Sequence, residues 1–517
     1  MPIALLSGMF GTLFSAGLLG FDATLVKVEV DVANGLPGWV MVGLPEKAVQ
    51  ESKERVGAAL KNSGLHIEAR KTTINLAPAT HKKSGGQYDL PIAVGLLLAH
   101  QVLSSFNTSK FLFVGELSLT GELKPIAGAL LFTMLAKQKN FEAIILPKAN
   151  AKEASLISNL TIVGCESISE VTQFLKEGTI PPLSLHLISP AESGNTPADF
   201  SEVKGQLLAK RALEIAAAGG HHLLMMGPPG SGKTMLASRF PSILPPLTES
   251  QSLETTKIYS SLGLLDAERP LIRIAPIRFP HHSISYAGLI GGGDGHVSPG
   301  EITLAHNGVL FLDELPEFHR DSLQMLRQPL ESGSILLTRS KGRLKLPARF
   351  QMIAACNPCR CGYLGHPRRA CVCAPGNVFQ YRRKISGPLL DRIDLHVEMG
   401  PLCETDLFEN VEGETSARIH ERVLQARHLQ QKRYEGQRIF CNTQLSGKQM
   451  ASLCRLTTEA LKFFRKMFPA LNLSARAHDK ILKVARTISD LAQSECIHSE
   501  QIAEAIQYRC LDREGAL

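Results

Sequence analysis

The pattern of apolar and polar positions changes along the 517-residue chain. Residues 1–178 alternate short apolar runs, such as "ATLVKVEVDV" and "EAIILP", with amphipathic stretches such as "PEKAVQESKERVGAALKNSG". Continuous or period-two apolar runs predict strands, and apolar positions three or four apart predict helices. We therefore expect the first part of the chain to be an α/β or α+β domain.

The rest of the chain divides into three further parts. Residues 179–200, "TIPPLSLHLISPAESGNTPADF", are rich in Pro, Ser and other turn-forming residues and predict a linker. Residues 201–405 contain buried-type strands and every nucleotide-binding motif of the chain. Residues 406–517 have helical periodicity, as in "ARAHDKILKVARTISDLAQS", and predict a small all-α domain. The expected fold class is therefore multi-domain α/β, with an α-helical C-terminus.

One short segment, "LTRSKGRLKL" at 337–346, combines strand periodicity with positive charge. Its alternate positions and its central Ser-Lys-Gly predict a β-hairpin with a cationic tip and a cationic face. The basic residues are Arg339, Lys341, Arg343 and Lys345. Between Ser332 and Leu390 the chain has eleven Lys or Arg and no Asp or Glu, which points to an anionic partner. The alternative is an exposed edge strand that its charges protect against aggregation.

Composition narrows the class of protein. With 44% hydrophobic and 20% charged residues and a net charge of +8, the chain is typical of a soluble globular protein. The first residues, "MPIALLSGMFGTLFSAGLLGF", lack a basic segment and contain four glycines, so we expect neither a signal peptide nor a membrane span. Eleven cysteines without a secretory signal indicate thiols or metal ligands in a reducing compartment. We expect a cytoplasmic protein.

The segment "GPPGSGKT" follows an apolar run and precedes a helical pattern, which is the context of a phosphate-binding loop. Glycines allow backbone N–H groups to surround phosphates, Lys233 can reach the β and γ oxygens, and the Thr234 hydroxyl can ligate Mg²⁺. ATP and Mg²⁺ are the expected cofactors. The predicted binding residues are Gly227, Pro228, Pro229, Gly230, Ser231, Gly232, Lys233 and Thr234.

Two further apolar runs end in polar residues that suit ATP hydrolysis. "GVLFLDELPEF" places Asp313 where it can hold Mg²⁺ and Glu314 where it can orient and deprotonate the attacking water. "FQMIAACNP" ends in Asn357, an uncharged group suited to contact the γ-phosphate or the water. Taken singly, an acidic pair after a buried strand is often a helix N-cap, and an Asn at the end of a strand is more often a turn residue.

Four cysteines form a C-x-C-x9-C-x-C pattern that can close a tetrahedral zinc site. They are Cys359, Cys361, Cys371 and Cys373. The C-x-C spacing is tighter than the usual C-x2-C, and four unrelated loop thiols remain the alternative. The adjacent His281 and His282 are interpreted as packing or capping groups, with no metal.

The order of these motifs identifies a family. The phosphate loop, "FLDE", Asn357, "PLLDRIDLHVEM" and "LSARAHDKILKVARTI" follow one another as in AAA+ ATPases. "RFPHHSISYAGLIGGG" and "PGEITLAHNGVLFLDELPEF" resemble the magnesium-chelatase and MCM-like branch of that superfamily. "DVANGLPGWVMVGLPEKAVQESKERVGAAL" and "YDLPIAVGLL" are similar to the bacterial ComM (YifB) family, and the resemblance extends over nearly the whole chain.

The resemblance implies roles for two arginines. Arg392 in "LLDRIDL" matches the arginine finger, which reaches the γ-phosphate of a neighbouring subunit. Arg476 in "SARAH" matches the second sensor on the helical lid. The alternative for each is a salt bridge, with Asp391 and Asp394 as local partners. A finger supplied by a neighbour implies an oligomer, by analogy a hexameric ring. In this branch a hairpin before the first-sensor strand points into the ring channel, so the cationic hairpin is expected to contact DNA without sequence preference.

The N-terminal region resembles the proteolytic domain of Lon in "NLAPATHKKSGGQYDLPIAVGLLLA" and "FVGELSLTGELKPIAGALLFTMLA". Asp89 matches the position of the Lon nucleophile, and Leu130 matches that of the Lon base. An aspartate cannot form the acyl-enzyme as a serine does, and a leucine has no proton to transfer. We expect a non-proteolytic domain that serves assembly or guides nucleic acid. Lys82 and Lys83 are candidate phosphate contacts, and a solvated lysine pair is the alternative.

The resemblance implies a hexameric, ATP-driven helicase that promotes branch migration and integration of transforming DNA. Its expected partners are single-stranded and branched DNA and recombination proteins. One rival function is a chelatase-type remodeller that acts through a protein partner. The N-terminal domain disfavours it, because that domain is not expected in the chelatase motor subunit. The other is an ATP-dependent protease, which Asp89 and Leu130 disfavour.

Overall fold

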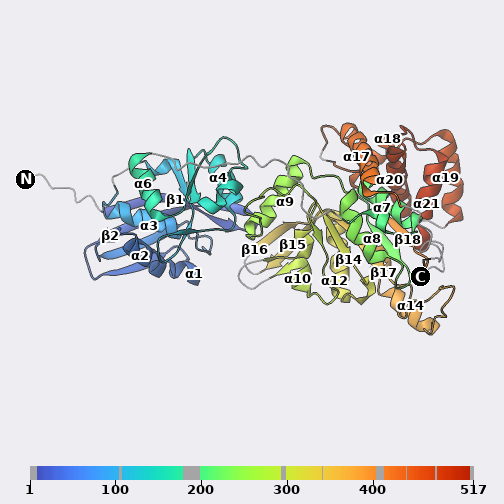
Figure 1. Cartoon of the computed structure of the whole chain (residues 1–517), viewed down its shortest axis with the longest axis horizontal. Coiled ribbons are helices and arrows are strands. Elements are labelled where there is room, and N and C mark those ends of the chain that lie inside the picture. Colours follow the sequence, from blue (N-terminus) through green and yellow to red (C-terminus); the bar gives the residue numbers. More distant parts are fainter. Residues whose placement is uncertain are drawn as a thin grey trace, which may run out of the picture. The chain divides into compact units, whose positions relative to one another are not determined.

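A computed structural model shows two compact units, one made of residues 1–191 and 249–272 and the other of residues 192–248 and 273–517 (Figure 1). Most of the predicted linker, residues 179–197, lies outside the described part of the chain. The described residues are 9–103, 107–178, 198–292, 298–339, 342–402, 413–437, 439–471 and 474–512.

The first unit is built on a mixed seven-stranded sheet in the order β3-β4-β2-β1-β5-β8-β9. The strands are β1 (Met9–Leu19), β2 (Asp22–Ala33), β3 (Gly38–Val42), β4 (Lys71–Ala77), β5 (Phe111–Phe113), β8 (Ala143–Pro147) and β9 (Thr161–Cys165). β1 and β2 form a long antiparallel hairpin, while β5, β8 and β9 run parallel. Alternate residues of β2, such as Val28 and Val30, are buried, as the period-two pattern predicts.

Helices cover this sheet. They are α1 (Lys47–Gln50), α2 (Ser52–Asn62), α3 (Asp89–Ala99), α4 (Ala129–Gln138), α5 (Ala151–Ala154) and α6 (Ile168–Glu177), with the short ribbon β6 (Glu116–Leu117) and β7 (Leu123–Lys124) and the turns η1 (Thr108–Lys110) and η2 (Lys148–Asn150). α3 is apolar on every side, and nearly all of its residues are buried. The N-terminal region is therefore an α+β domain, as its sequence pattern predicts.

Helix α9 (Glu249–Ser261) follows the phosphate-loop helix in sequence but belongs to the first unit. The Gly128 N–H donates a hydrogen bond to the Ser260 carbonyl (2.8 Å), and the Ser260 hydroxyl donates to the Glu153 carboxylate (2.5 Å). Lys152 forms an ion pair with Glu268 just beyond the helix (2.5 Å). A segment between two nucleotide motifs is thus built into the N-terminal unit.

The second unit contains a five-stranded parallel sheet in the order β11-β14-β17-β10-β18. The strands are β10 (Leu223–Met226), β11 (Ile277–Arg278), β14 (Val309–Leu312), β17 (Gln351–Cys356) and β18 (Leu395–Glu398). β10 and β14 are buried at every position, which is typical of parallel strands covered by helices on both faces. Because parallel strands end at one edge, the residues that follow β10, β14 and β17 lie near one another.

Short elements surround this sheet. The helices are α7 (Leu207–Gly219), α8 (Lys233–Arg239), α10 (Tyr286–Ile290), α11 (Glu301–Leu304), α12 (Arg320–Met325), α13 (Arg327–Ser332), α14 (Pro375–Arg383) and α15 (Gly387–Leu390). Two ribbons pair β12 (Gly291–Gly292) with β13 (Ser298–Pro299) and β15 (Ser334–Arg339) with β16 (Gly342–Pro347). The 3-10 turns are η3 (Phe200–Glu202), η4 (Phe240–Ile243) and η5 (Leu315–Glu317).

The C-terminal part is all-α, as its periodicity predicts. Its elements are α17 (Ser416–Arg433), η6 (Asn442–Gln444), α18 (Gly447–Leu453), α19 (Thr458–Ala470), α20 (Ala475–Leu491), α21 (Ser499–Gln507) and η7 (Cys510–Asp512). Their apolar faces form one buried core with α7 and the parallel sheet, and α7 lies beside α17 and α20 (Figure 1). Over the described residues, none of the helices has both the length and the apolar character that a membrane crossing requires.

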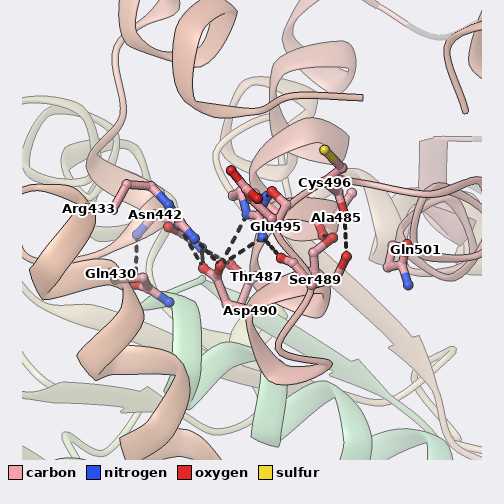
Figure 2. A network of polar contacts seen from close by, with 12 residues as sticks. Gln430, Arg433, Asn442, Ala485, Thr487, Ser489, Asp490, Glu495, Cys496 and Gln501 are labelled. Carbon is pink, nitrogen blue, oxygen red and sulfur yellow. Dashed lines mark hydrogen bonds and ion pairs between the residues drawn. The ribbon is translucent and has the colours of Figure 1, made fainter. Parts of the chain in front are cut away.

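A buried polar network holds these helices together (Figure 2). Asp490 on α20 accepts hydrogen bonds from Arg433 (3.1 Å), Arg486 (3.1 Å) and Asn442 (2.9 Å). Asn442 also donates to the Thr487 hydroxyl (2.9 Å), which lies 2.7 Å from His221 Nε2. The network therefore extends from the helical part to the residues that precede β10.

Candidate functional site

The phosphate loop connects β10 to α8 and depends on its glycines. Gly230 and Gly232 have φ angles of +78° and +89°, a region that residues with a side chain rarely adopt. A Cβ atom at Gly227 would lie 2.8 Å from the Met399 carbonyl oxygen, so the close approach to the chain after β18 requires glycine there. The loop thus has the backbone geometry for wrapping phosphate groups.

Lys233 lies inside this loop and is buried. Its ammonium group donates to the carbonyls of Gly227 (2.8 Å) and Pro228 (2.9 Å) and to Asn357 Oδ1 (3.2 Å). Burial lowers the pKa of Lys233, and the charge of Asp313 opposes that shift. The first and third motifs of the sequence, separated by more than a hundred residues, therefore meet at one ammonium group.

The second motif joins them through Thr234. Its hydroxyl donates to Asp313 Oδ2 (2.7 Å), and the Glu314 N–H donates to Asp313 Oδ1 (2.8 Å). A hydroxyl and a carboxylate are the hard oxygen ligands that Mg²⁺ prefers, so this pair fits the expected ion. Glu314 has a left-handed φ of +49° at the end of β14. Such a strained backbone at a non-glycine residue is typical of functional positions.

The sequence did not indicate a contact between Glu314 and a histidine. His282 Nδ1 lies 3.3 Å from Glu314 Oε2, and the ring of His282 packs against that of His281 at a centroid distance of 4.1 Å. His282 therefore contacts the side chain that the sequence predicts to activate water. His282 lies 32 positions before Glu314 in the sequence. No motif spacing predicts a contact between residues that far apart.

Arg392 contacts residues of its own chain. Its guanidinium pairs with Glu331 (2.6 Å) and donates to the carbonyls of Arg327 (3.1 Å) and Pro388 (2.6 Å). The hydrogen bond that the Arg392 guanidinium donates to the Glu331 carboxylate lowers the pKa of Glu331. The salt-bridge alternative named neighbouring aspartates as partners, whereas the partner in the structure is a glutamate 61 positions earlier in the chain.

The two aspartates beside Arg392 bind residues of helix α20 instead. Asp391 pairs with the exposed Arg476 (3.4 Å), and the buried Asp394 pairs with Lys480 (2.7 Å). Burial acts to raise the pKa of Asp394, but the Lys480 charge and neighbouring groups hold it well below its ordinary value. Two ion pairs thus connect the predicted lid helix to the short segment between α15 and β18.

The four predicted zinc ligands come together in one cluster. Their sulfur atoms all lie within 4.8 Å of one another, and those of Cys359, Cys361 and Cys371 are separated by 3.3, 3.5 and 3.6 Å. Four sulfurs at about 2.3 Å from a tetrahedral zinc are separated by about 3.8 Å. Backbone N–H groups of Tyr363 and Val372 lower the pKa of Cys361 to about 6, which favours the thiolate that a metal binds. The cluster consists of Cys359, Cys361, Cys371 and Cys373.

The predicted cationic hairpin is the ribbon of β15 and β16. Lys345 is exposed and lies opposite the half-exposed Leu336, while Ile335 and Leu346 on the other face are buried. The backbone register pairs Arg339 with Gly342 and Arg343 with Thr338. Ser340 and Lys341 at the tip lie outside the described residues. Three residues after β16, the chain enters β17, which ends at Asn357.

The two positions that match the Lon nucleophile and base are occupied by the buried Asp89 and Leu130. Asp89 is fully buried and receives two hydrogen bonds from Arg55 (2.7 and 3.0 Å), together with one from the Leu117 N–H (3.2 Å). Burial raises the pKa of Asp89, and the hydrogen bond from Arg55 opposes that rise. Leu130 is buried in α4, and its N–H donates to Glu153 (2.9 Å).

The two lysines of "HKKSGG" differ in exposure. Lys83 is buried, and its ammonium donates to the carbonyls of His81 (2.9 Å) and Pro78. Burial lowers the pKa of Lys83. Lys82 is exposed, so it alone of the pair presents its charge on the surface.

Three family models match the chain. A model described as magnesium chelatase, subunit ChlI, matches residues 199–407, and its C-terminal counterpart matches residues 413–509. A model described as subunit ChlI of Mg-chelatase matches residues 28–150. The last match contradicts the expectation that the N-terminal domain distinguishes this chain from chelatase-type proteins.

Two similar proteins match nearly the whole chain. Competence protein ComM of Haemophilus influenzae is 43% identical over 506 residues, 97% of either chain, and YifB of Escherichia coli is 43% identical over 500 residues, 96% of either chain. Shorter similarities connect about a third of the chain to Lon protease 2 of Bacillus subtilis (28%, 31% of that protein) and DNA repair protein RadA of Listeria monocytogenes (27%, 35% of that protein). The chain belongs to the ComM (YifB) family of proteins with a magnesium-chelatase-type AAA+ domain.

Proposed function

We propose that the protein is a cytoplasmic, ATP-driven DNA motor that works as a homo-hexameric helicase or translocase. In this role it promotes branch migration and integration of DNA during natural transformation. One observation carries the proposal. The ribbon that bears the exposed Lys345 leads into β17, and Asn357 at the end of β17 contacts Lys233 of the phosphate loop. A structural change at the γ-phosphate can therefore be transmitted to the ribbon through Asn357 and the strand β17.

Hydrolysis follows from the residues around the loop. The loop backbone and Lys233 bind the phosphates, and Thr234 with Asp313 holds Mg²⁺, which neutralises charge on the phosphate oxygens. Glu314, oriented by His282, accepts the proton of the attacking water. Asn357 stands 3.2 Å from the Lys233 ammonium, where an uncharged amide can contact the γ-phosphate.

The oligomer is part of the proposal because of Arg392. Within its own subunit this side chain is engaged by Glu331 and two carbonyls. As an arginine finger it would exchange Glu331 for the γ-phosphate of a neighbouring subunit, and a charge-assisted contact of that kind can stabilise transition-state charge. Arg476 on α20 would act as the second sensor from the lid.

DNA is the substrate that the charge distribution favours. The eleven basic residues between Ser332 and Leu390, without any acidic residue, suit a phosphate backbone, and such binding depends on salt rather than sequence. Arg339, Lys341, Arg343 and Lys345 of the ribbon, with Lys82, are the proposed contacts. The names of two similar proteins, a competence protein and a DNA repair protein, support a role in DNA metabolism. The proposal also includes one structural Zn²⁺ at the four clustered cysteines.

A second candidate is a chelatase-type remodeller that acts on a protein partner. The family models described as magnesium chelatase subunit favour it. The two functions differ in what stimulates ATP hydrolysis. We expect single-stranded and branched DNA to raise the ATPase rate of the purified protein several-fold, and porphyrin or unfolded protein to leave it unchanged. Stimulation by porphyrin or unfolded protein, with none by DNA, would overturn the DNA motor and favour the remodeller.

A further inference from the structure

The cysteine cluster lies in the loop between the sensor strand and α14. Cys359 follows Asn357 by two residues and is fully buried, and Cys373 stands two residues before the start of α14. Arg382 on α14 donates to the Pro358 carbonyl (3.1 Å), which closes the base of the loop. The loop is thus fixed to the strand that carries Asn357.

The same loop rests on the phosphate loop. Gly362, between the second cysteine and Tyr363, has a φ of +85°, and its N–H donates to the Cys359 carbonyl (3.0 Å). A Cβ atom at Gly362 would lie 2.5 Å from Cδ and 2.7 Å from Cγ of Pro229. Only a glycine allows this turn to pack so closely against Pro229.

The contact has consequences for nucleotide binding. Pro229 is part of the segment whose backbone must wrap the phosphates, and the glycines on either side give this segment conformational freedom. If the cysteine loop beside Pro229 is rigid, the phosphate loop has less conformational freedom before it binds nucleotide. Binding then costs less conformational entropy, and the affinity for nucleotide is higher. A loop of turns without a buried core needs a cross-link to be rigid, and a tetrahedral metal supplies one.

We propose that Zn²⁺ bound by Cys359, Cys361, Cys371 and Cys373 makes this loop a rigid brace for the phosphate loop, with Gly362 on Pro229 as the point of contact. The proposal rests on the nucleotide site but not on the identity of the substrate that the motor moves. Loss of the metal would weaken ATP binding even though no cysteine belongs to the nucleotide site.

Two glycines of the loop give a matched test of the brace. Gly362→Ala and Gly365→Ala both place an alanine at a positive φ (+85° and +77°), but a Cβ atom at Gly365 would meet nothing within 4 Å. We expect Gly362→Ala to raise the dissociation constant for a fluorescent ATP analogue about tenfold and to keep its zinc. Gly365→Ala should bind the analogue like wild type. Equal affinities for the two variants would overturn the brace.

Metal analysis of protein purified without a His tag tests the zinc itself. We expect about one zinc per chain in wild type and in Cys496→Ser, a cysteine outside the cluster. The double variant Cys359→Ser with Cys371→Ser should lose the metal and bind the ATP analogue about tenfold more weakly, with an unchanged helical signal in circular dichroism. Metal-free wild type would overturn the proposal. Lys233→Ala, which should lose nucleotide binding while retaining zinc, separates a failure of the brace from a failure of the nucleotide site.

Discussion

We expect the second unit to lose stability in mild acid because of the buried His222. It stands directly before β10, and its Nδ1 accepts a hydrogen bond from the Met352 N–H of β17 (3.0 Å). Burial lowers the pKa of His222 to about 4, although the charge of Asp394 acts in the opposite direction. A proton on Nδ1 would remove the acceptor that joins two strands of the nucleotide-binding sheet.

The sign and size of the effect follow from the two pKa values. In the unfolded chain a histidine has a pKa of about 6.5. Between that value and about 4, the unfolded chain binds a proton that the folded unit does not, so the free energy of unfolding falls as the pH falls. From pH 7 to pH 5 this one side chain costs about 2 kcal/mol of stability.

Hydrogen exchange read by mass spectrometry can follow this unit separately from the N-terminal one. Peptides that contain β10 and β17 should lose protection between pH 7 and pH 5, after correction for the intrinsic exchange rate. His222→Asn keeps an amide oxygen as an acceptor but cannot be protonated, so it should recover about 2 kcal/mol of that loss. His428→Gln, at an exposed position of α17, should behave like wild type. An equal loss of protection in wild type and His222→Asn would refute the reasoning.

Three further predictions concern the catalytic centre and the helical core. Glu314→Gln should bind ATP normally but not hydrolyse it in a single-turnover assay; normal turnover would remove Glu314 from its role. Arg392→Ala mixed with Lys233→Ala should recover part of the ATPase activity that each lacks alone, and no recovery in proven mixed assemblies would contradict a finger in trans. Asp490→Asn should cost about 3–5 kcal/mol in urea unfolding, because it removes the carboxylate that compensates the charges of the buried Arg486 and the partly buried Arg433. Arg455→Ala, at an exposed 4.0 Å pair, should cost about 0–1 kcal/mol, and equal costs would contradict the network.

The sequence predicted that its nucleotide-type motifs lie close together, because their placement follows from strand order. Three apolar runs predict buried parallel strands, and parallel strands place the residues that follow them at one edge. The structure accordingly brings Lys233 within 3.2 Å of Asn357, and Thr234 within 2.7 Å of Asp313. The cysteine cluster was predictable for a similar reason, since two close pairs joined by a turn-rich loop can fold back on themselves.

Other features depend on packing between distant segments, which no local pattern records. Helix α9 has a weakly amphipathic sequence, so its place in the N-terminal unit is decided by contacts such as Ser260 with Glu153. The sequence does not indicate the pairing of Arg392 with Glu331, because Asp391 and Asp394 are the acidic residues nearest to it in the chain. Lys83 sits in a polar sequence that predicts exposure, but backbone carbonyls satisfy its ammonium in a buried position.

The central claim is that the β15–β16 ribbon grips a phosphate backbone. Its most direct test is the dependence of DNA affinity on salt in a variant with Lys341→Ala, Arg343→Ala and Lys345→Ala. A control variant removes three exposed charges elsewhere, through Lys137→Ala, Lys139→Ala and Lys176→Ala. Both variants lose the same net charge, so only the location of that charge differs between them.

We predict that the ribbon variant binds every DNA sequence more weakly than the control does. The slope of log affinity against log salt concentration should also be smaller in magnitude, by up to about three, because three phosphate contacts are lost. ATP hydrolysis without DNA should persist, because none of these three residues belongs to the motifs that bind the nucleotide. If the charges only protect an edge strand, soluble protein would be lost while DNA binding per folded molecule stayed the same. An unchanged salt slope in the ribbon variant would contradict the account.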